Sequence, residues 1–447
     1  MSDQFSIYAE LLSNIRQVSV VASLPSARNA STKAMLLNGG SRIHISHDGD
    51  TRELDLPAVV HTGGGAGSGP VVLPPTKPAA AAAAGAGAAA GRQCAWRLPL
   101  PPSRQAPPQA AASPAARGAA VPWEAVRIAP AATSVRCRSC RAIVVPGKRI
   151  ARWKDLPSAD WAEMMEFWHC HKPDDHADGR DGGEHEHSHN HDLEHRQDGG
   201  KANGQTLAGR GYGANSRIQG QKGVGLVDLA MFLFAEEDCE GIMFSPSSPG
   251  DFLESPSLDV LAGAPARHLG ASCSLCESTI GYYSFGTSAV TLLKWRVLIQ
   301  EEPEVDVAPA SPSMGQCLAA MLLSTIARSG SSKPLVVPMT GLVVGKGGQI
   351  LTSGKALSLW ILNSTIRFTS TAYSGSNVLA IKLLYKVITE EDATKVMESM
   401  NSDTQDVSIP DESLGSVIEM LDRSNAILPV DDRMFQGWKV GLLEQWE

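Results

Sequence analysis

The chain is 447 residues long, which is enough for two or three domains that each bury a core. Its composition, 43% hydrophobic and 19% charged, is typical of a globular protein, and its net charge of −8 argues against nonspecific nucleic-acid binding. We find no long apolar run outside an alanine tract, and no signal-peptide layout at the N-terminus. We therefore expect a cytoplasmic and nuclear protein that binds neither nucleic acid nor membranes, and whose thiols stay reduced.

Residues 1–62 are predicted to form a β-rich segment. Apolar or alternating stretches occur at 6–10, 18–22, 34–37 and 42–47. Turn sequences at 38–40 and 48–50 separate some of them, which favours a β-meander. His44 and His47 lie in the last stretch, and we expect them to be surface residues of a strand rather than metal ligands.

Two segments of biased composition interrupt the chain. Residues 63–120 are rich in Ala, Gly and Pro and are expected to be a disordered insertion, although Cys94 and Trp96 could mark a short strand returning to the core. Residues 174–220 are expected to be a disordered loop rich in His and Gly, whose tract at 184–191 could bind metal loosely. The glycines at 209–213 lack the flanking strand and Lys-Ser/Thr of a phosphate loop, so nucleotide binding is not predicted.

Two Cys-x-x-Cys motifs, Cys137 with Cys140 and Cys273 with Cys276, predict a metal centre. A two-residue gap lets both thiolates of a pair bind one ion, and two pairs supply the four sulfurs of one closed structural zinc site. Local disulfides, a redox centre or buried thiols without a ligand are the alternatives. Redox chemistry is disfavoured because neither pair opens the helix of a βαβ unit.

Residues 121–173 contain the first motif and a predicted helix rich in Trp. Ser158 is a suitable N-cap, and the apolar residues from Trp161 to Trp168 have helical spacing, which favours a face turned to the core. The helix runs into His169-Cys170-His171. A thiol beside imidazoles could bind metal or act as a nucleophile with its base, but these residues could equally pack at the helix end.

The rest of the chain predicts an α+β fold. Residues 221–305 hold the second motif and two expected strands, at 224–234 and 292–299; the basic residues in the latter are too few for a nucleic-acid surface. Residues 306–447 predict a separate α+β domain with helices at 315–328 and 411–425. The expected fold is therefore a β-rich N-terminal half stapled by one four-cysteine zinc site, an α+β C-terminal domain and disordered insertions.

Six stretches carry a resemblance to a known family. In chain order they are CRSC, LPSADWAEMMEFWHCHKP, GLVDLAMFLF, CSLCESTIGYY, LLKWRVLI and LP...RMFQGWKVGLLE. They resemble the HECT-like E3 ubiquitin ligases that bind a ubiquitin-conjugating enzyme (E2), with low-complexity insertions as in a fungal or algal member. The resemblance implies transfer of ubiquitin from an E2 to substrate lysines. It also implies a link to the zinc-dependent endonuclease of mRNA 3′-end cleavage and polyadenylation.

The cysteine positions leave three functions open. A HECT-type thioester needs a thiol in the C-terminal lobe, yet no cysteine follows Cys317. The carrier would have to be Cys170, Cys239 or Cys317, and Cys170 is the candidate because His169 and His171 could lower its pKa. Two motifs make one zinc site rather than the two of a RING. A second possibility is that the protein is a noncatalytic assembly or inhibitory factor, in which Cys170 binds the zinc ion of the endonuclease. A third is that it is an adaptor held together by its zinc site, without catalysis.

Overall fold

The structure is a computed structural model, and it describes twelve stretches of the chain. They are residues 5–62, 69–74, 91–102, 121–156, 219–245, 268–285, 287–301, 310–339, 342–344, 349–350, 353–399 and 403–447. The predicted helix at 158–168 and His169-Cys170-His171 lie outside them, as do most of both low-complexity segments. Within these stretches, no helix is both long and apolar enough to cross a membrane.

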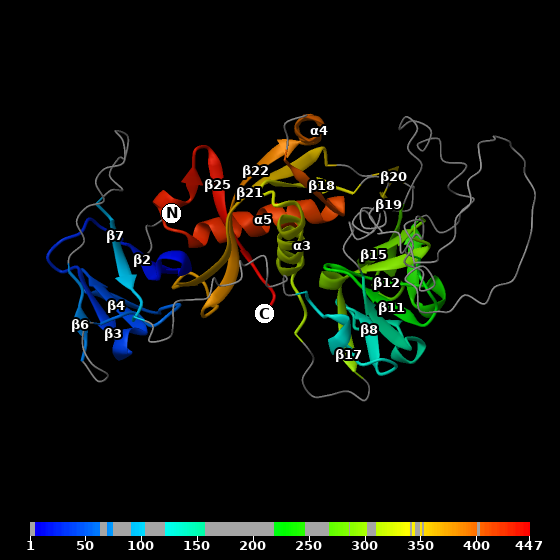
Figure 1. Ribbon diagram of the computed structural model, residues 1–447, viewed down its shortest axis with the longest axis horizontal. Helices are drawn as coiled ribbons and strands as arrows, with labels where there is room; N and C mark the ends of the chain where they lie inside the picture. The colour runs from blue at the N-terminus through cyan, green and yellow to red at the C-terminus, as the bar shows by residue number, and fades with distance from the viewer. Residues whose placement is uncertain are drawn as a thin grey trace, which may run out of the picture.

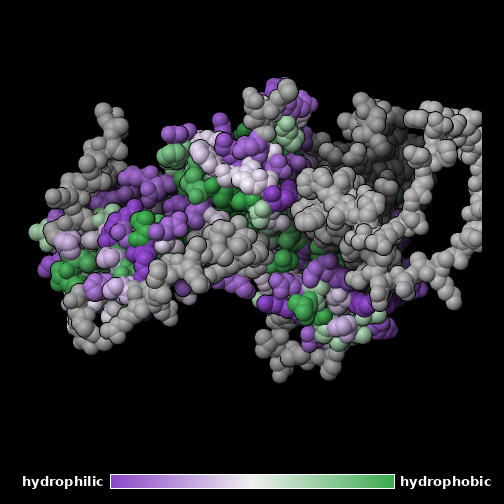
Figure 2. Space-filling model, in the orientation of Figure 1, coloured by the Kyte–Doolittle hydropathy of each residue, from purple (hydrophilic) through white to green (hydrophobic). Residues whose placement is uncertain are grey.

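The described chain is an α+β protein, as predicted, in which strands predominate. Three α-helices accompany the strands: α3 (Met314–Ser329), α4 (Glu390–Glu398) and α5 (Asp411–Ile427). N-terminal strands lie at one end of an elongated molecule, the C-terminal sheet with α3 and α5 lies in the middle, and the strands around the cysteine motifs lie at the other end (Figure 1). Hydrophobic residues form separate patches among hydrophilic ones on the face shown in Figure 2.

The central sheet combines the two ends of the chain. Its strands run in the order β24 (Met434–Phe435), β25 (Trp438–Glu444), β22 (Val378–Thr389), β21 (Lys355–Ser370), β1 (Ser6–Leu12), β2 (Gln17–Ser23) and β7 (Gln93–Pro99). β18 (Pro334–Pro338) pairs with the first half of β21 and with β23 (Gln405–Ile409). The predicted C-terminal unit therefore does not stand alone, because β1 pairs with the end of β21, with Tyr8 opposite Ser370.

Helices α3 and α5 cover one face of this sheet. Their apolar residues pack on Leu357, Leu359 and Leu383 of β21 and β22. Ser313 forms a capping box with Gln316 at the start of α3, and Gly330, with φ +71°, ends it in the left-handed conformation. Both helices predicted from apolar spacing are confirmed, and each is slightly longer than expected.

A small second sheet packs against the N-terminal strands. It has the order β5 (Asp50–Asp55), β4 (Arg42–His47), β3 (Lys33–Leu37) and β6 (Val71–Val72). The predicted returning strand is confirmed as β7, where Cys94 and Trp96 are buried. The surface position expected for His47 is wrong. It shares the core face of β4 with Ile43 and Ile45, and its ring nitrogens lie 2.7 and 2.8 Å from the hydroxyls of Ser26 and Thr32.

Two further sheets surround the cysteine motifs. The smaller has the order β17 (Val297–Glu301), β8 (Thr133–Cys137), β9 (Ile143–Val145). The larger has the order β10 (Arg152–Asp155), β11 (Val224–Val227), β12 (Met231–Phe234), β16 (Ala289–Leu293), β15 (Thr279–Ser284), β14 (His268–Cys273), β19 (Leu342–Val344), β20 (Gln349–Ile350), and β13 (Ile242–Ser245) pairs with β14.

The two strands predicted in this region are each broken into two. A tight turn separates β11 from β12, with the Asp228 amide donating to the Met231 carbonyl. A 3-10 turn, Lys294–Arg296, separates β16 from β17, and these two strands belong to different sheets. An apolar run does not distinguish one long strand from two short buried ones, which is why the sequence pattern missed both turns.

Candidate metal centre

Two similar three-stranded ribbons carry the cysteine motifs. Cys137 ends β8 between β17 and β9, and Cys273 ends β14 between β13 and β15. The amide of the residue after each of these cysteines donates to the carbonyl of the residue just before an outer strand. Arg138 donates to the Arg296 carbonyl, before β17, at 3.0 Å, and Ser274 donates to the Gly241 carbonyl, before β13, at 2.8 Å. The same local pairing therefore presents both motifs on the hairpin turns that follow β8 and β14.

The backbone of the two hairpin turns is also the same. The amides of Arg141 and Glu277, four residues after the first cysteine of each motif, donate to the Cys137 and Cys273 carbonyls at 2.9 and 2.8 Å. Both residues have positive φ, +62° and +58°, which is uncommon outside glycine. Each turn brings its own two thiols together, and the packing of the sheets brings the two turns face to face.

The four sulfurs have the geometry of a metal site. The Sγ atoms of Cys137 and Cys276 lie 3.7 Å apart, those of Cys140 and Cys273 lie 3.6 Å apart, and all four lie within 4.8 Å of one another. Tetrahedral zinc with Zn–S bonds of about 2.3 Å separates its sulfurs by about 3.8 Å. All four cysteines are free, so the local disulfides considered from the sequence are absent from these motifs. The set can coordinate one metal ion, as the spacing predicted.

The thiols differ in electrostatic environment. Hydrogen bonds with the Ser278 hydroxyl and amide lower the pKa of Cys276 to about 6. The Ala142 amide lowers the pKa of Cys140, but burial and the three other thiols outweigh it and raise this pKa to about 12. Four crowded sulfurs cannot all carry a charge without a cation, and a bound metal ion supplies it.

The centre is closed and lies at the edge of a core, since Cys140 and Cys276 are only partly buried. Cys137 and Cys273 are fully buried among Val135, Phe232 and Val290. Four protein sulfurs complete a tetrahedral shell and leave no position for water or substrate. The arrangement is therefore suited to holding the two ribbons together and not to catalysis at the metal.

Comparison with known proteins shows the family. The family described as HECT-like ubiquitin-conjugating enzyme (E2)-binding matches residues 10–440. The chain belongs to this family. An uncharacterized protein of Schizosaccharomyces pombe is 22% identical over 332 residues, which cover 73% of this chain and 78% of that protein. An uncharacterized protein of Saccharomyces cerevisiae is 39% identical over 41 residues, 9% of this chain and 12% of that protein. No solved structure matches. Membership of the HECT-like E2-binding family supports an E2 as partner.

The remaining described thiols of this HECT-like protein are poor nucleophiles. Burial, with the carboxylates of Asp238 and Glu236, raises the pKa of Cys239 to about 12, and burial within α3 raises that of Cys317 to about 12. Cys94 is buried in the N-terminal core. A thioester carrier needs an accessible thiolate, so none of these three is suited to that role. The candidate residues Cys170 and His171 lie outside the described residues and stay predictions.

Sequence reasoning missed the role of Lys294. It was expected in a half-buried strand, but its side chain is fully buried beside the metal-centre core. The Nζ atom donates to the carbonyls of Pro122 and Asp228 at 2.5 Å each and lies 5.2 Å from the centre of the Phe232 ring. Burial lowers the pKa of Lys294 to about 8. Lys294 thus ties together two segments far apart in the chain; its only sequence signal was a lysine inside an apolar run.

Proposed function

We propose that this protein acts as an E3 ubiquitin-protein ligase: it binds a ubiquitin-conjugating enzyme and promotes transfer of ubiquitin to substrate lysines in the cytoplasm and nucleus. The observation that carries the proposal is the match of the HECT-like E2-binding family over residues 10–440. We further propose that the four-cysteine centre holds one zinc ion, because four thiolates in a closed tetrahedron are typical of structural zinc. The ion stabilises the fold, and ubiquitin transfer occurs elsewhere.

Two chemical routes are compatible with this function. In the covalent route, the Cys170 thiolate attacks the E2–ubiquitin thioester carbonyl and the E2 thiolate leaves; a substrate amine then attacks the new thioester, forms the amide and releases Cys170. His171 would take up the thiol proton. In the direct route, the protein holds the charged E2 while the substrate lysine attacks it. The raised pKa values of Cys239 and Cys317 make Cys170 the proposed carrier for the covalent route.

A single-turnover assay separates these routes. Fluorescent ubiquitin, preloaded on an E2, is mixed with the protein, and products are resolved with and without reductant. A reducible adduct that disappears in Cys170→Ala but persists in the matched control Cys239→Ala supports the covalent route. Substrate ubiquitination without an adduct supports the direct route. A protein that neither binds any charged E2 nor accelerates discharge contradicts the proposed function.

The second proposal uses the same thiol without catalysis. Here the protein is an inhibitory or assembly factor of the mRNA 3′-end processing endonuclease, and Cys170 caps that enzyme's zinc site in the position that water needs. The other cysteines are in the metal-centre set or largely buried, which leaves Cys170 for this role. The test is co-purification of the endonuclease from nuclear extract. Cys170→Ser should abolish inhibition of the nuclease and leave the melting temperature unchanged; absence of the endonuclease from the purified complex counts against this role.

A further inference from the structure

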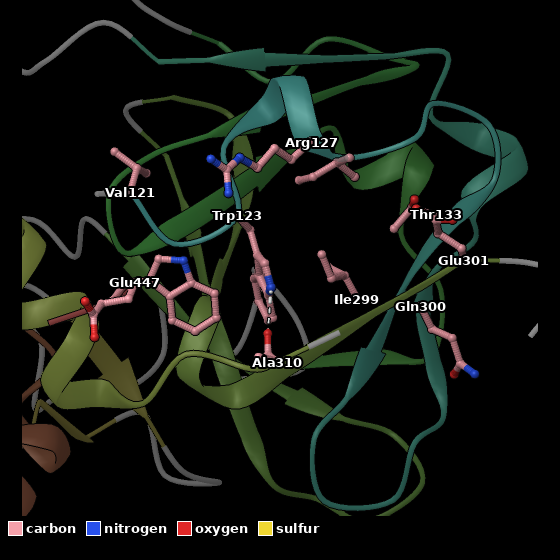
Figure 3. A pocket seen from close by; sticks show the side chains of 11 residues that line it. Val121, Trp123, Arg127, Thr133, Ile299, Gln300, Glu301, Ala310 and Glu447 are labelled. Atoms are coloured by element: carbon pink, nitrogen blue, oxygen red, sulfur yellow. Dashed lines mark hydrogen bonds between the residues drawn. The ribbon is translucent and has the colours of Figure 1, made fainter. Parts of the chain in front are cut away.

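A pocket of about 230 Å³ lies where the metal-centre strands meet the residues that follow β25 (Figure 3). Trp123, Ile128 and Ile299, all members of the metal-centre core, form its walls together with Trp446. The pocket is therefore an unfilled end of a hydrophobic core, and two distant parts of the chain enclose it. It shares no lining residue with the four-cysteine centre.

The walls of the pocket are held in place before any ligand binds. The indole nitrogen of Trp123 donates to the Ala310 carbonyl at 3.0 Å (Figure 3). The Trp123 ring stacks on Phe232 with 5.7 Å between centroids. Trp446 is partly buried and packs against the same core. Because aromatic side chains fixed in this way lose little freedom on binding, they favour recognition of an apolar group.

Thr133 gives the pocket an unused hydrogen-bonding group. Thr133 is only 2% exposed, and its Oγ1 atom has no hydrogen-bond partner among the residues that the structure describes. A buried hydroxyl without a partner is unfavourable, and native structures seldom keep one without a reason. Thr133 lines the pocket, and rotation about its Cα–Cβ bond moves Oγ1 to another staggered position without breaking a hydrogen bond. The hydroxyl is thus available to a ligand in the pocket.

The size and charge of the pocket indicate the class of ligand. Sites for small molecules usually exceed about 300 Å³, so this volume suits one large side chain. The rim is mixed: it has the guanidinium of Arg127, whose side chain is 77% exposed and lies 3.4 Å from Glu124, and the carboxylates of Glu301 and Glu447. Opposite charges around the opening favour a neutral dipolar group, such as a peptide backbone, over an ion of either sign.

We infer that this pocket binds one bulky apolar side chain of an extended peptide and is a substrate-recognition subsite. The side chain contacts Trp123, Ile299 and Trp446, and the Thr133 hydroxyl bonds to a peptide polar group beside it. That the peptide belongs to a ubiquitination substrate rests on the proposed function. The peptide-binding chemistry itself rests on the pocket alone.

The test uses the full-length metal-loaded protein and blocked pentapeptides Gly-Ser-Xaa-Ser-Gly, titrated by ligand-observed NMR. We expect peptides with Trp, Phe or Leu at Xaa to bind about tenfold more tightly than those with Ala, Lys or Asp. Ala310→Trp, which fills the opening, should weaken binding at least about tenfold. Thr133→Val should weaken it about fivefold without lowering the melting temperature, because the hydroxyl bonds to nothing in the free protein. Val126→Ala, 85% exposed and outside the pocket, is the control and should change nothing.

Several outcomes overturn the inference. One is equal binding of all peptides, and another is a destabilised Thr133→Val variant with unchanged peptide affinity. A further one is peptide binding that appears only when residues 302–309 are replaced by a Gly/Ser linker, which would identify that segment as the occupant of the pocket. E2 binding is measured on the same samples. Wild-type protein that binds an E2 but no peptide overturns the inference alone, whereas protein that binds apolar peptides but no E2 contradicts the proposed function alone.

Discussion

The ammonium group of Lys382 on β22 lies 2.7 Å from Oε2 of Glu10 on β1, although the two residues are 372 positions apart. Glu10 is 5% exposed and also accepts a hydrogen bond of 2.9 Å from the Tyr8 hydroxyl. The pair therefore links the first strand to the C-terminal half of the sheet. The N-terminal strand is a structural part of the C-terminal unit.

Removal of either partner of this pair should destabilise the protein. Lys382→Met leaves the Glu10 carboxylate buried without its cation, and we expect the free energy of unfolding to fall by about 3 kcal/mol. The double variant that combines Lys382→Met with Glu10→Gln should lose less free energy of unfolding, measured by urea denaturation, than the two single variants lose together. Lys395→Met, from an exposed pair with Glu391 on α4, is the control and should cost less than about 1 kcal/mol. Equal losses for Lys382→Met and Lys395→Met would contradict the role of the buried pair.

The four-cysteine centre should hold one metal ion that the fold needs. After deletion of the histidine-rich tract at 184–191, elemental analysis should find about one zinc ion per chain. Cys137→Ser should lose the ion and most of the stability of the surrounding sheets, since structural zinc contributes on the order of 10 kcal/mol to folding. Cys317→Ser, outside the centre, should retain the metal. Full stability after chelation would rule out the structural role.

Lys294 predicts a specific dependence of stability on pH. Burial holds its pKa at about 8 in the folded protein, below the value of about 10.4 in an unfolded chain. Between these values the unfolded state binds more protons, so the contribution of Lys294 to stability should rise from pH 8 to about pH 10.4. Lys294→Met should be less stable than wild type at pH 7, because two buried carbonyls lose their hydrogen-bond donor. The difference in free energy of unfolding between wild type and the variant should grow from pH 8 to about pH 10.4. Parallel pH profiles of the two proteins would contradict this prediction.

Two glycines should respond oppositely to alanine. A Cβ at Gly281 would lie 1.9 Å from the Thr291 carbonyl oxygen on the paired strand β16, so Gly281→Ala must force β15 and β16 apart. We expect a loss of about 3 kcal/mol in thermal or urea unfolding. Gly415 of α5 has no atom within 4 Å of the corresponding position, and Gly415→Ala should stabilise the helix by up to about 1 kcal/mol. Tolerance of Gly281→Ala would show that the two strands separate easily.

Thiol alkylation should distinguish the cysteines. In the native metal-loaded protein at pH 7.5, Cys239 and Cys317 should react slowly with iodoacetamide, because burial raises both pKa values to about 12. Rapid labelling is expected at Cys170, because the proposed role of its neighbouring histidines is to lower the thiol pKa. Peptide mass spectrometry identifies the labelled positions, and all eight cysteines should react after denaturation and metal removal. Fast native labelling of Cys317 would contradict the burial argument.

The sequence alone predicted part of the site and of the fold. The two-residue spacing of Cys137 with Cys140, and of Cys273 with Cys276, identified the four-sulfur set, because metal-ligand spacing is a local property of a turn. The helices predicted at 315–328 and 411–425, which the structure places at 314–329 and 411–427, could be found for a similar reason, since apolar spacing extends over only a few turns. The order of six motifs also identified the HECT-like family.

Only the tertiary structure decided how these local parts combine. It placed β1 beside β21, buried His47 and Lys294, and divided two apolar runs into separate strands. It also enclosed the pocket between Trp123 and Trp446 and left Thr133 Oγ1 without a partner there. The physical reason is that burial and strand pairing depend on contacts between residues that are not neighbours in the chain, from 15 positions apart for His47 and Thr32 to 372 for Glu10 and Lys382. No local period in the sequence records which distant segment will supply them.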